Sequence, residues 1–432
     1  MVEKWLKVSL LLCTFGFFRE LRPSEPFVTE YLSGDYRNIT SDQINKEVYP
    51  FGTYSVLAQL VIVFLVTDLL RYKPIIVLSA IAGIILFAIL LWTRSVLELQ
   101  IGQIFFGTFM AAEVAYYTYI YTKVNRDRYQ IVTGHTRAAI LTGKFLGGVL
   151  AQTLISLDAM DFRGLHFISF GTQIISLPIS LMLPKVPRSL YFYASSENKE
   201  QGQNTMQIAD APPTPTADPP KFSLTNAGRL LCSHFISSYT NPIVVQWSVW
   251  WALATCGQLQ VISYIQFLWK EVAPNNFSVY NGGVEAVATL LGALGAISAG
   301  MLNSNKRRTR YMLFNSTCMA VLGVLLLVSS RTDEVWLTYI SYAVFSGIFF
   351  FIITVAGAIV AENVVDDSFG LVFGINTLAA LILQTILTIV VVTDNGFGMN
   401  PRDQYLTYGF YFLSIAAVFF LVQLLIKLFK KS

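Results

Sequence analysis

The side chains that could do chemistry in this sequence are a few ionisable groups inside long apolar stretches. Glu113 is the most informative of them, because Tyr116 and Tyr117 follow it by three and four residues and would share its face of a helix. A carboxylate beside aromatic rings attracts an organic cation, by charge and by cation–π contact. The alternative interpretation is that Glu113 forms a structural ion pair with a base on a neighbouring helix. Charged groups at membrane depth are costly, so we interpret these three residues as substrate-binding candidates.

Lys144 is a second charged group inside an apolar stretch. We expect it to pair with Glu113, but it could instead face an anionic substrate directly. Arg137 lies about two turns earlier, at 3.6 residues per turn, and close to the cytoplasmic end of the same predicted helix. This position suits a gate residue.

Glu25 stands between Pro23 and Pro26, and two prolines this close break or unwind a helix end. Irregular backbone at membrane depth is tolerated where it lines a cavity, which makes Glu25 a binding candidate. The alternative interpretation is that the segment around Glu25 is simply an ordinary outer loop.

Asn281 is a further binding candidate, because its amide offers both a donor and an acceptor and the glycines after it allow close helix approach.

The composition predicts a membrane protein rather than an enzyme or a nucleic-acid binder. The 432 residues are 54% hydrophobic and only 13% charged, whereas soluble domains average about 25% charged residues. The net charge of +4 is too small and too dispersed for nucleic-acid binding. The three histidines are scattered, and no metal-ligand spacing, nucleophile elbow or phosphate loop is present. We therefore expect no catalysis, metal or cofactor, and four cysteines that are free thiols.

Apolar runs without strand-like alternation indicate the elements that position these residues. There are twelve such runs, at residues 5–22, 53–70, 74–92, 97–121, 133–155, 165–183, 243–269, 280–301, 311–330, 335–360, 369–392 and 405–429. The sequence thus predicts an all-α membrane protein with twelve transmembrane helices in two six-helix halves, residues 1–184 and 241–432. Residues 185–240 are rich in proline and polar residues and should form a flexible cytoplasmic linker. This is the plan of a major-facilitator transporter, and we expect a monomer surrounded by membrane lipid.

The loop charges give the orientation. With the N-terminus in the cytoplasm, the cytoplasmic segments hold 19 lysines and arginines and the outer segments hold 7. This bias places both termini in the cytoplasm. Asn38 and Asn276 begin glycosylation sequons, and both fall in loops that the charge count places outside. They are candidate glycosylation sites of a plasma-membrane protein.

The loop after the second predicted helix could contribute to an inner gate. Asp68 precedes Arg71 there, in a degenerate form of the cytoplasmic signature of the major-facilitator fold. Asp68 could pair with a base from the next cytoplasmic loop, such as Arg128. The alternative is ordinary anchoring by positive charge on the cytoplasmic side.

The chain resembles the reduced folate and thiamine carrier family of vitamin transporters. The matching stretches run through nearly all the predicted spans and comprise residues 22–27, 67–74, 111–117, 247–251, 268–272, 280–282 and 372–377. The resemblance implies a transporter that moves a water-soluble vitamin by alternating access of a central site.

The resemblance also bears on the substrate. The folate branch of the family carries bases where this chain has the uncharged Ser346 and Gln384. The residues that match the site of the thiamine branch are Glu25, Glu113, Tyr116, Asn281 and Gln384.

Two positions depart from the thiamine branch. Gly52 stands where that branch has a tryptophan, and Lys144 stands where it has a tyrosine. Because the other matching residues and the missing bases agree with the thiamine branch, the resemblance still favours thiamine or a related organic cation as the substrate. A folate or another anionic vitamin stays open, as does a receptor of the same fold that does not transport.

Overall fold

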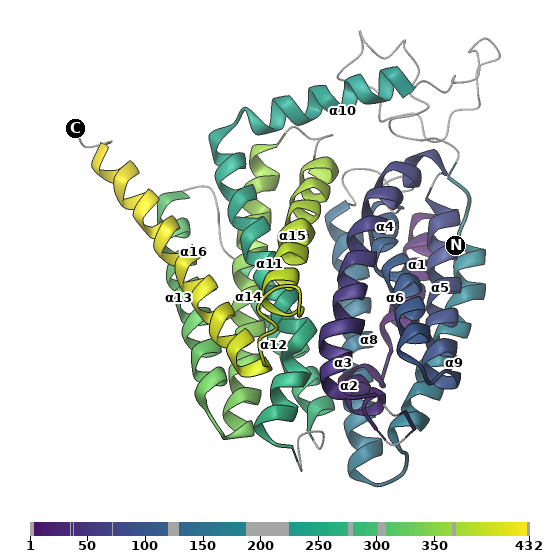
Figure 1. Ribbon diagram of the computed structural model, residues 1–432. Coiled ribbons are helices and arrows are strands. Elements are labelled where there is room, and N and C mark those ends of the chain that lie inside the picture. The colour runs from purple at the N-terminus through teal and green to yellow at the C-terminus, as the bar shows by residue number, and fades with distance from the viewer. Residues whose placement is uncertain are drawn as a thin grey trace, which may run out of the picture.

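The computed structural model describes residues 4–34, 36–37, 39–70, 72–119, 129–186, 224–274, 280–300, 308–364 and 369–429, and every structural statement below concerns these residues. They form helices and no strands. Figure 1 shows two helical bundles side by side, one from each half of the chain. The C-terminus and helix α10 lie toward one end of the molecule, and the N-terminus lies at the side of the first bundle, in the half nearer that end (Figure 1).

The first bundle holds six long helical segments. They are α1 (Lys4–Glu20), α4 (Tyr49–Leu69), α5 (Lys73–Trp92), α6 (Val96–Ala111) continued by α7 (Glu113–Tyr119), α8 (Tyr129–Ser156) and α9 (Phe162–Met182). Short helical pieces follow α1 at the far end from the termini: η1 (Glu25–Phe27), α2 (Val28–Leu32), α3 (Ser41–Gln43) and η2 (Ile44–Val48).

The second bundle is also built from six long helices. They are α11 (Pro242–Val272), α12 (Asn281–Gly300), α13 (Arg308–Arg331), α14 (Val335–Asn363), α15 (Phe369–Val391) and α16 (Pro401–Phe429). Each of the twelve predicted runs is helical where it is described, with ends that differ by a few residues. Within the described residues, eight helices are long and apolar enough to cross a membrane by length and composition alone. Helices satisfy their own backbone hydrogen bonds, which a lipid environment requires.

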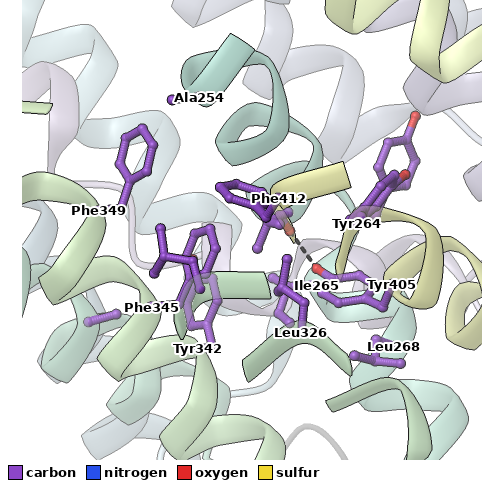
Figure 2. Packing of buried hydrophobic residues seen from close by; sticks show 14 of the residues in the cluster. Ala254, Tyr264, Ile265, Leu268, Leu326, Tyr342, Phe345, Phe349, Tyr405 and Phe412 are labelled. Atoms are coloured by element: carbon purple, nitrogen blue, oxygen red, sulfur yellow. Dashed lines mark hydrogen bonds between the residues drawn. The ribbon is translucent and has the colours of Figure 1, made fainter. Parts of the chain in front are cut away.

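The second bundle has an aromatic core. Figure 2 shows Phe345 and Phe412, whose rings meet edge to face with 5.4 Å between their centroids. Nearby, the buried Tyr405 hydroxyl donates a 2.6 Å hydrogen bond to the Val261 carbonyl and joins α16 to α11. A buried phenol needs such a partner, because an unpaired hydroxyl in an apolar core is costly.

Helix α10 (Leu224–Tyr239) occupies the last part of the segment predicted to be a flexible linker. Figure 1 shows it lying across one end of the second bundle rather than along the spans. Its apolar residues do not form a continuous run, and a helix of mixed polarity is not visible in a search for long apolar stretches. The rest of the linker lies outside the described residues.

Candidate substrate site

The site begins at the end of α1, where three charged side chains are buried together. Arg19, Glu20 and Arg22 are 2%, 4% and 6% exposed. The Arg19 guanidinium donates to one carboxylate oxygen of Glu20 at 2.7 Å, and Arg22 donates to the other at 2.9 Å. Buried charges are tolerated when paired and hydrogen-bonded in this way. Both arginines are thereby held by one carboxylate.

Arg19 also bonds to a break in the fourth span. The span is interrupted at Ala112, where α6 ends and α7 begins. The Phe109 carbonyl, in the last turn of α6, accepts a 2.7 Å hydrogen bond from Arg19. The same guanidinium lies 4.2 Å from the centroid of the Phe109 ring. A backbone carbonyl released at membrane depth needs a partner, and Arg19 supplies it. The break makes Glu113 the first residue of α7.

Lys144 is placed beside Glu20 rather than in the expected pair with Glu113. Its ammonium lies 3.6 Å from the Glu20 carboxylate, while its side chain is 46% exposed. Lys144 is in the middle of α8, so a half-exposed side chain there contacts a buried carboxylate. The predicted ion pair with Glu113 is wrong in this structure, although Glu113 is close enough to interact electrostatically with Lys144.

Glu25 and Glu113 are the carboxylates of the site that stay partly exposed. The Glu25 side chain is 51% exposed and forms a 3.1 Å ion pair with Arg22. Glu113 is of intermediate exposure. Electrostatic interactions connect both carboxylates to Lys144 and Arg22. The structure thus brings these four charged groups, from the end of α1, η1, α7 and α8, into one region.

The two tyrosines after Glu113 differ in surroundings. Tyr116 is buried in the first bundle, where its hydroxyl donates a 3.3 Å hydrogen bond to the Leu12 carbonyl and its ring lies against Gly16. Tyr117 is only partly buried, and its ring meets that of Tyr116 edge to face at 5.2 Å. Tyr117 is therefore the more accessible of the two in this conformation.

Asn281 connects the two halves. It is fully buried, its amide group donates a 3.4 Å hydrogen bond to the Pro26 carbonyl, and its oxygen accepts one of 2.9 Å from the Tyr339 hydroxyl. Gln384 is 4% exposed and lies in α15, where its backbone carbonyl accepts a 3.2 Å hydrogen bond from Gln260. Asn281 thus lies next to the candidate-site segment at Pro26, whereas the hydrogen bond at the Gln384 carbonyl lies within the second bundle.

Polar contacts close the interface between the halves at the end distant from the termini. The Gln266 amide donates to the Glu25 carbonyl at 2.9 Å, and its oxygen accepts from the Thr29 backbone at 3.2 Å. Lys270 donates to the Ser33 hydroxyl. Because Gln266 and Lys270 lie on α11 and their partners lie on η1, in α2 or just after α2, these bonds join the two bundles.

Glycines tighten the same interface between α8 and α12. A Cβ atom on Gly148 would lie 2.7 Å from the Gly282 carbonyl, and one on Gly282 would lie 2.9 Å from the Gly148 carbonyl. Lys46 adds a 2.9 Å ion pair with Asp394 across the halves. These contacts close the structure at this end, while the side chains of Lys144 and Glu25 remain about half exposed.

The other predicted residues are placed only in part. Arg137 is exposed on α8. Asp68 ends the α4 region, and its side chain is outside the described residues, as are Arg71, Arg128 and the sequon asparagines Asn38 and Asn276. The gate and glycosylation predictions therefore stay predictions.

Sequence reasoning gave no role to Arg19 and Glu20, although they were visible as charges at the end of an apolar run. Glu285 is another ionisable group in an apolar run to which the sequence assigns no specific role, and it accepts a 3.1 Å hydrogen bond from the Tyr342 hydroxyl inside the second bundle. The residue types mark these positions as unusual, but the partners Phe109, Lys144 and Tyr342 come from distant parts of the chain and are not visible in the sequence.

Comparison with known proteins identifies the family. Residues 3–407 match the family model described as reduced folate carrier. Thiamine transporter 1 of Mus musculus is 37% identical over 99% of this chain and 91% of its own length. Folate transporter 1 of Caenorhabditis elegans is 38% identical over 99% and 94%, and the human reduced folate transporter is 32% identical over 98% and 73%.

Solved structures show the fold. The nucleoside transporter NupG has a TM-score of 0.63 at 13% identity, covering 96% of this chain and 99% of its own. A peptide transporter POT in complex with sulfate has a TM-score of 0.64 at 11% identity, covering 96% and 94%. These likenesses confirm the predicted fold, and the named relatives are carriers rather than enzymes. The chain belongs to the reduced folate carrier family.

Proposed function

We propose that this protein carries thiamine or a related organic cation across the plasma membrane by alternating access. The observation that carries the proposal is the distribution of charge in the site. Arg19 and Arg22 are buried and held by Glu20, whereas the carboxylates of Glu25 and Glu113 are partly exposed. A site whose arginines are paired and whose carboxylates are accessible favours a cation. Relatives named as thiamine transporters support the same substrate class.

In this proposal Glu113 holds the positive charge of the substrate, and Tyr117 contacts its ring by stacking or cation–π interaction. Asn281 couples the site to the interface, since it bonds both to Pro26 in the first half and to Tyr339 in the second. The two halves, residues 1–184 and 241–432, rock about the site. The structure is closed at the proposed outer end, and both termini are cytoplasmic in this orientation.

Uptake of labelled thiamine by cells expressing the protein tests the proposal. The variant Glu113→Gln removes the charge while keeping the shape of the side chain. We expect it to reduce saturable uptake by at least about tenfold, the scale of one lost charge-assisted contact. Glu47→Gln, which changes an exposed carboxylate on η2 outside the candidate site, is the control. Unchanged thiamine uptake in Glu113→Gln would refute the site assignment.

A second candidate substrate is a folate or another anionic vitamin. The half-exposed ammonium of Lys144 favours it, and one of the relatives at 38% identity is named a folate transporter. Competition between labelled thiamine and labelled folate in the same cells separates the two. Binding of either without time-dependent accumulation would indicate a receptor that does not transport.

A further inference from the structure

Three arginines gather around one tyrosine at the outer end of the first bundle, far from the substrate site. The guanidinium carbons of Arg37, Arg94 and Arg163 lie 5.3, 4.5 and 4.6 Å from the centroid of the Tyr36 ring. They come from the loop after α2, the turn between α5 and α6, and the first turn of α9. Three like charges around one ring repel one another unless negative charge is close.

Part of this arrangement caps a helix. The Leu90 carbonyl, in the last turn of α5, accepts hydrogen bonds from Arg37 and from the Tyr31 hydroxyl, the latter at 2.9 Å. Arg163 approaches the Leu91 carbonyl at 3.5 Å. Cations at a helix C-terminus are favourable, because the last carbonyls lack partners and carry partial negative charge.

Capping leaves several donors unused. Arg37 is 3% exposed, yet its Nε and Nη1 atoms are buried without a hydrogen-bond partner, and so is the Nε atom of Arg163. Buried guanidinium donors are rarely left unpaired, and each such group needs an explanation such as an ion. Arg94 is exposed and gives access to the cluster from outside.

The nearest described carboxylates are engaged elsewhere. Glu98 accepts hydrogen bonds from the Arg94 and Ser95 backbones at 3.0 and 2.9 Å and so caps α6. Asp161 accepts from the Gly164 backbone at 2.7 Å and caps α9. Among the described residues, neither forms an ion pair with the three arginines. Positive charge dominates at Tyr36, where the hydrogen-bonding Arg94 guanidinium lowers the pKa of the phenol.

The surroundings suit the level of lipid headgroups. Trp92 ends α5 beside the cluster and is 54% exposed, and its ring meets Phe167 edge to face at 6.1 Å. Arg163 lies 5.9 Å from the same Phe167 ring. Exposed aromatic residues of this kind mark the membrane–water interface.

We propose that Arg37, Arg94 and Arg163 form a binding site for a phosphate group at the outer membrane interface. The guanidinium fork matches the oxygens of a phosphate, and the unpaired donors of Arg37 and Arg163 would be satisfied by it. Inorganic phosphate and the headgroup of a phospholipid share this chemistry. The site is independent of the transported substrate.

The test is the melting temperature of the purified full-length protein in an uncharged detergent. One arm adds inorganic phosphate against sodium chloride of equal ionic strength. The other adds phosphatidylcholine against diacylglycerol with the same chains, in phosphate-free buffer. We expect a rise in melting temperature in at least one arm, and the arm that responds identifies the source of the phosphate group.

Arg94→Gln is the main variant, because Arg94 is exposed and its loss should not disturb folding. We expect its response to phosphate or lipid to require about tenfold more ligand than the wild type, the scale of one lost charged hydrogen bond. Arg331→Gln, an exposed arginine at the outer end of α13, should respond as the wild type does. If the wild type gains no stability in either arm, or if Arg94→Gln responds fully, the arginines only cap α5 and the proposal is wrong.

Discussion

Glu20 is the residue on which the buried charges of the substrate site converge. It accepts hydrogen bonds from Arg19 and Arg22 and lies 3.6 Å from the ammonium of Lys144. Glu20→Gln would keep the shape, leave the buried Arg19 guanidinium without its counter-charge, and leave Arg22 with only the half-exposed Glu25. Breaking a buried charge pair in this way costs about 3–5 kcal/mol, so we expect a clear loss of thermal stability in detergent. Glu47→Gln should leave the melting temperature unchanged, and an equal effect of the two variants would contradict the buried network.

Lys144 is the residue that separates the cation and anion hypotheses. Glu20 is already bonded to two arginines, so the network should survive the loss of its more distant, half-exposed third partner. Lys144→Met removes a positive charge beside Glu25 and Glu113. A partly screened charge is worth on the order of 1 kcal/mol, so we expect the KM for thiamine to fall about fivefold. Lys144→Arg, which keeps the charge, should behave as the wild type does.

The opposite outcome would be equally informative. If Lys144→Met abolishes folate uptake and leaves thiamine uptake unchanged, the lysine binds an anionic substrate. The two uptake assays in the same cells, corrected for surface expression, therefore decide the sign of the substrate charge at this position.

Residue types in the sequence were enough to nominate the candidate site residues but not their pairing. Glu25, Glu113 and Lys144 could be identified because ionisable groups in apolar runs are costly. The partner of Lys144 could not, because Glu20 is more than 100 residues away in sequence and becomes a neighbour only when α1 and α8 pack together. Distances of this kind depend on tertiary packing, which a single sequence does not show.

At the scale of elements, the helices were predictable because long apolar runs have few other structures available in lipid. The break in the fourth span was not. It falls at Ala111 and Ala112, with no proline or glycine there to mark it. What accompanies the break is a contact from another helix, the hydrogen bond from Arg19 to the Phe109 carbonyl. Local sequence rules do not include such a contact.

The contact between α8 and α12 leads to a prediction about closure of the outer end. A Cβ atom on Gly148 would lie 2.7 Å from the Gly282 carbonyl, a distance that side-chain motion cannot relieve. Gly148→Ala should therefore separate the halves at this end and reduce uptake by about tenfold, since overpacking of a tight contact costs about 1–3 kcal/mol. Each bundle keeps its own core, so the protein should still fold.

Gly134→Ala is the matched control, because Gly134 is on the same helix and a Cβ atom there would have no neighbour within 4 Å. It should retain full uptake and the wild-type melting temperature. Wild-type uptake in Gly148→Ala would show that close approach of α8 and α12 is not needed for transport.

At the scale of the whole molecule, the two-bundle architecture leaves one choice for the orientation in the membrane: the end with α10 faces either the cytoplasm or the outside. The C-terminus and α10 lie at one end, and the short elements η1 and α2, to which Gln266 bonds, lie toward the other (Figure 1). If the charge bias is read correctly, the end with α10 is cytoplasmic. The structure is then closed toward the outside.

Cys232 offers a direct test of this orientation with a native side chain. It is exposed on α10, whereas Cys256 is buried and Cys13 and Cys318 are partly buried inside spans. A membrane-impermeant maleimide should leave Cys232 unmodified in intact cells and modify it after permeabilisation. Cys232→Ser should remove that labelling, which assigns the signal to α10. All the helices of a bundle are joined by short turns or loops. Labelling of Cys232 in intact cells would therefore mean that the orientation of the whole molecule is the reverse of the predicted one. The closed end would then face the cytoplasm, and Lys144 and Glu25 would be reached from outside.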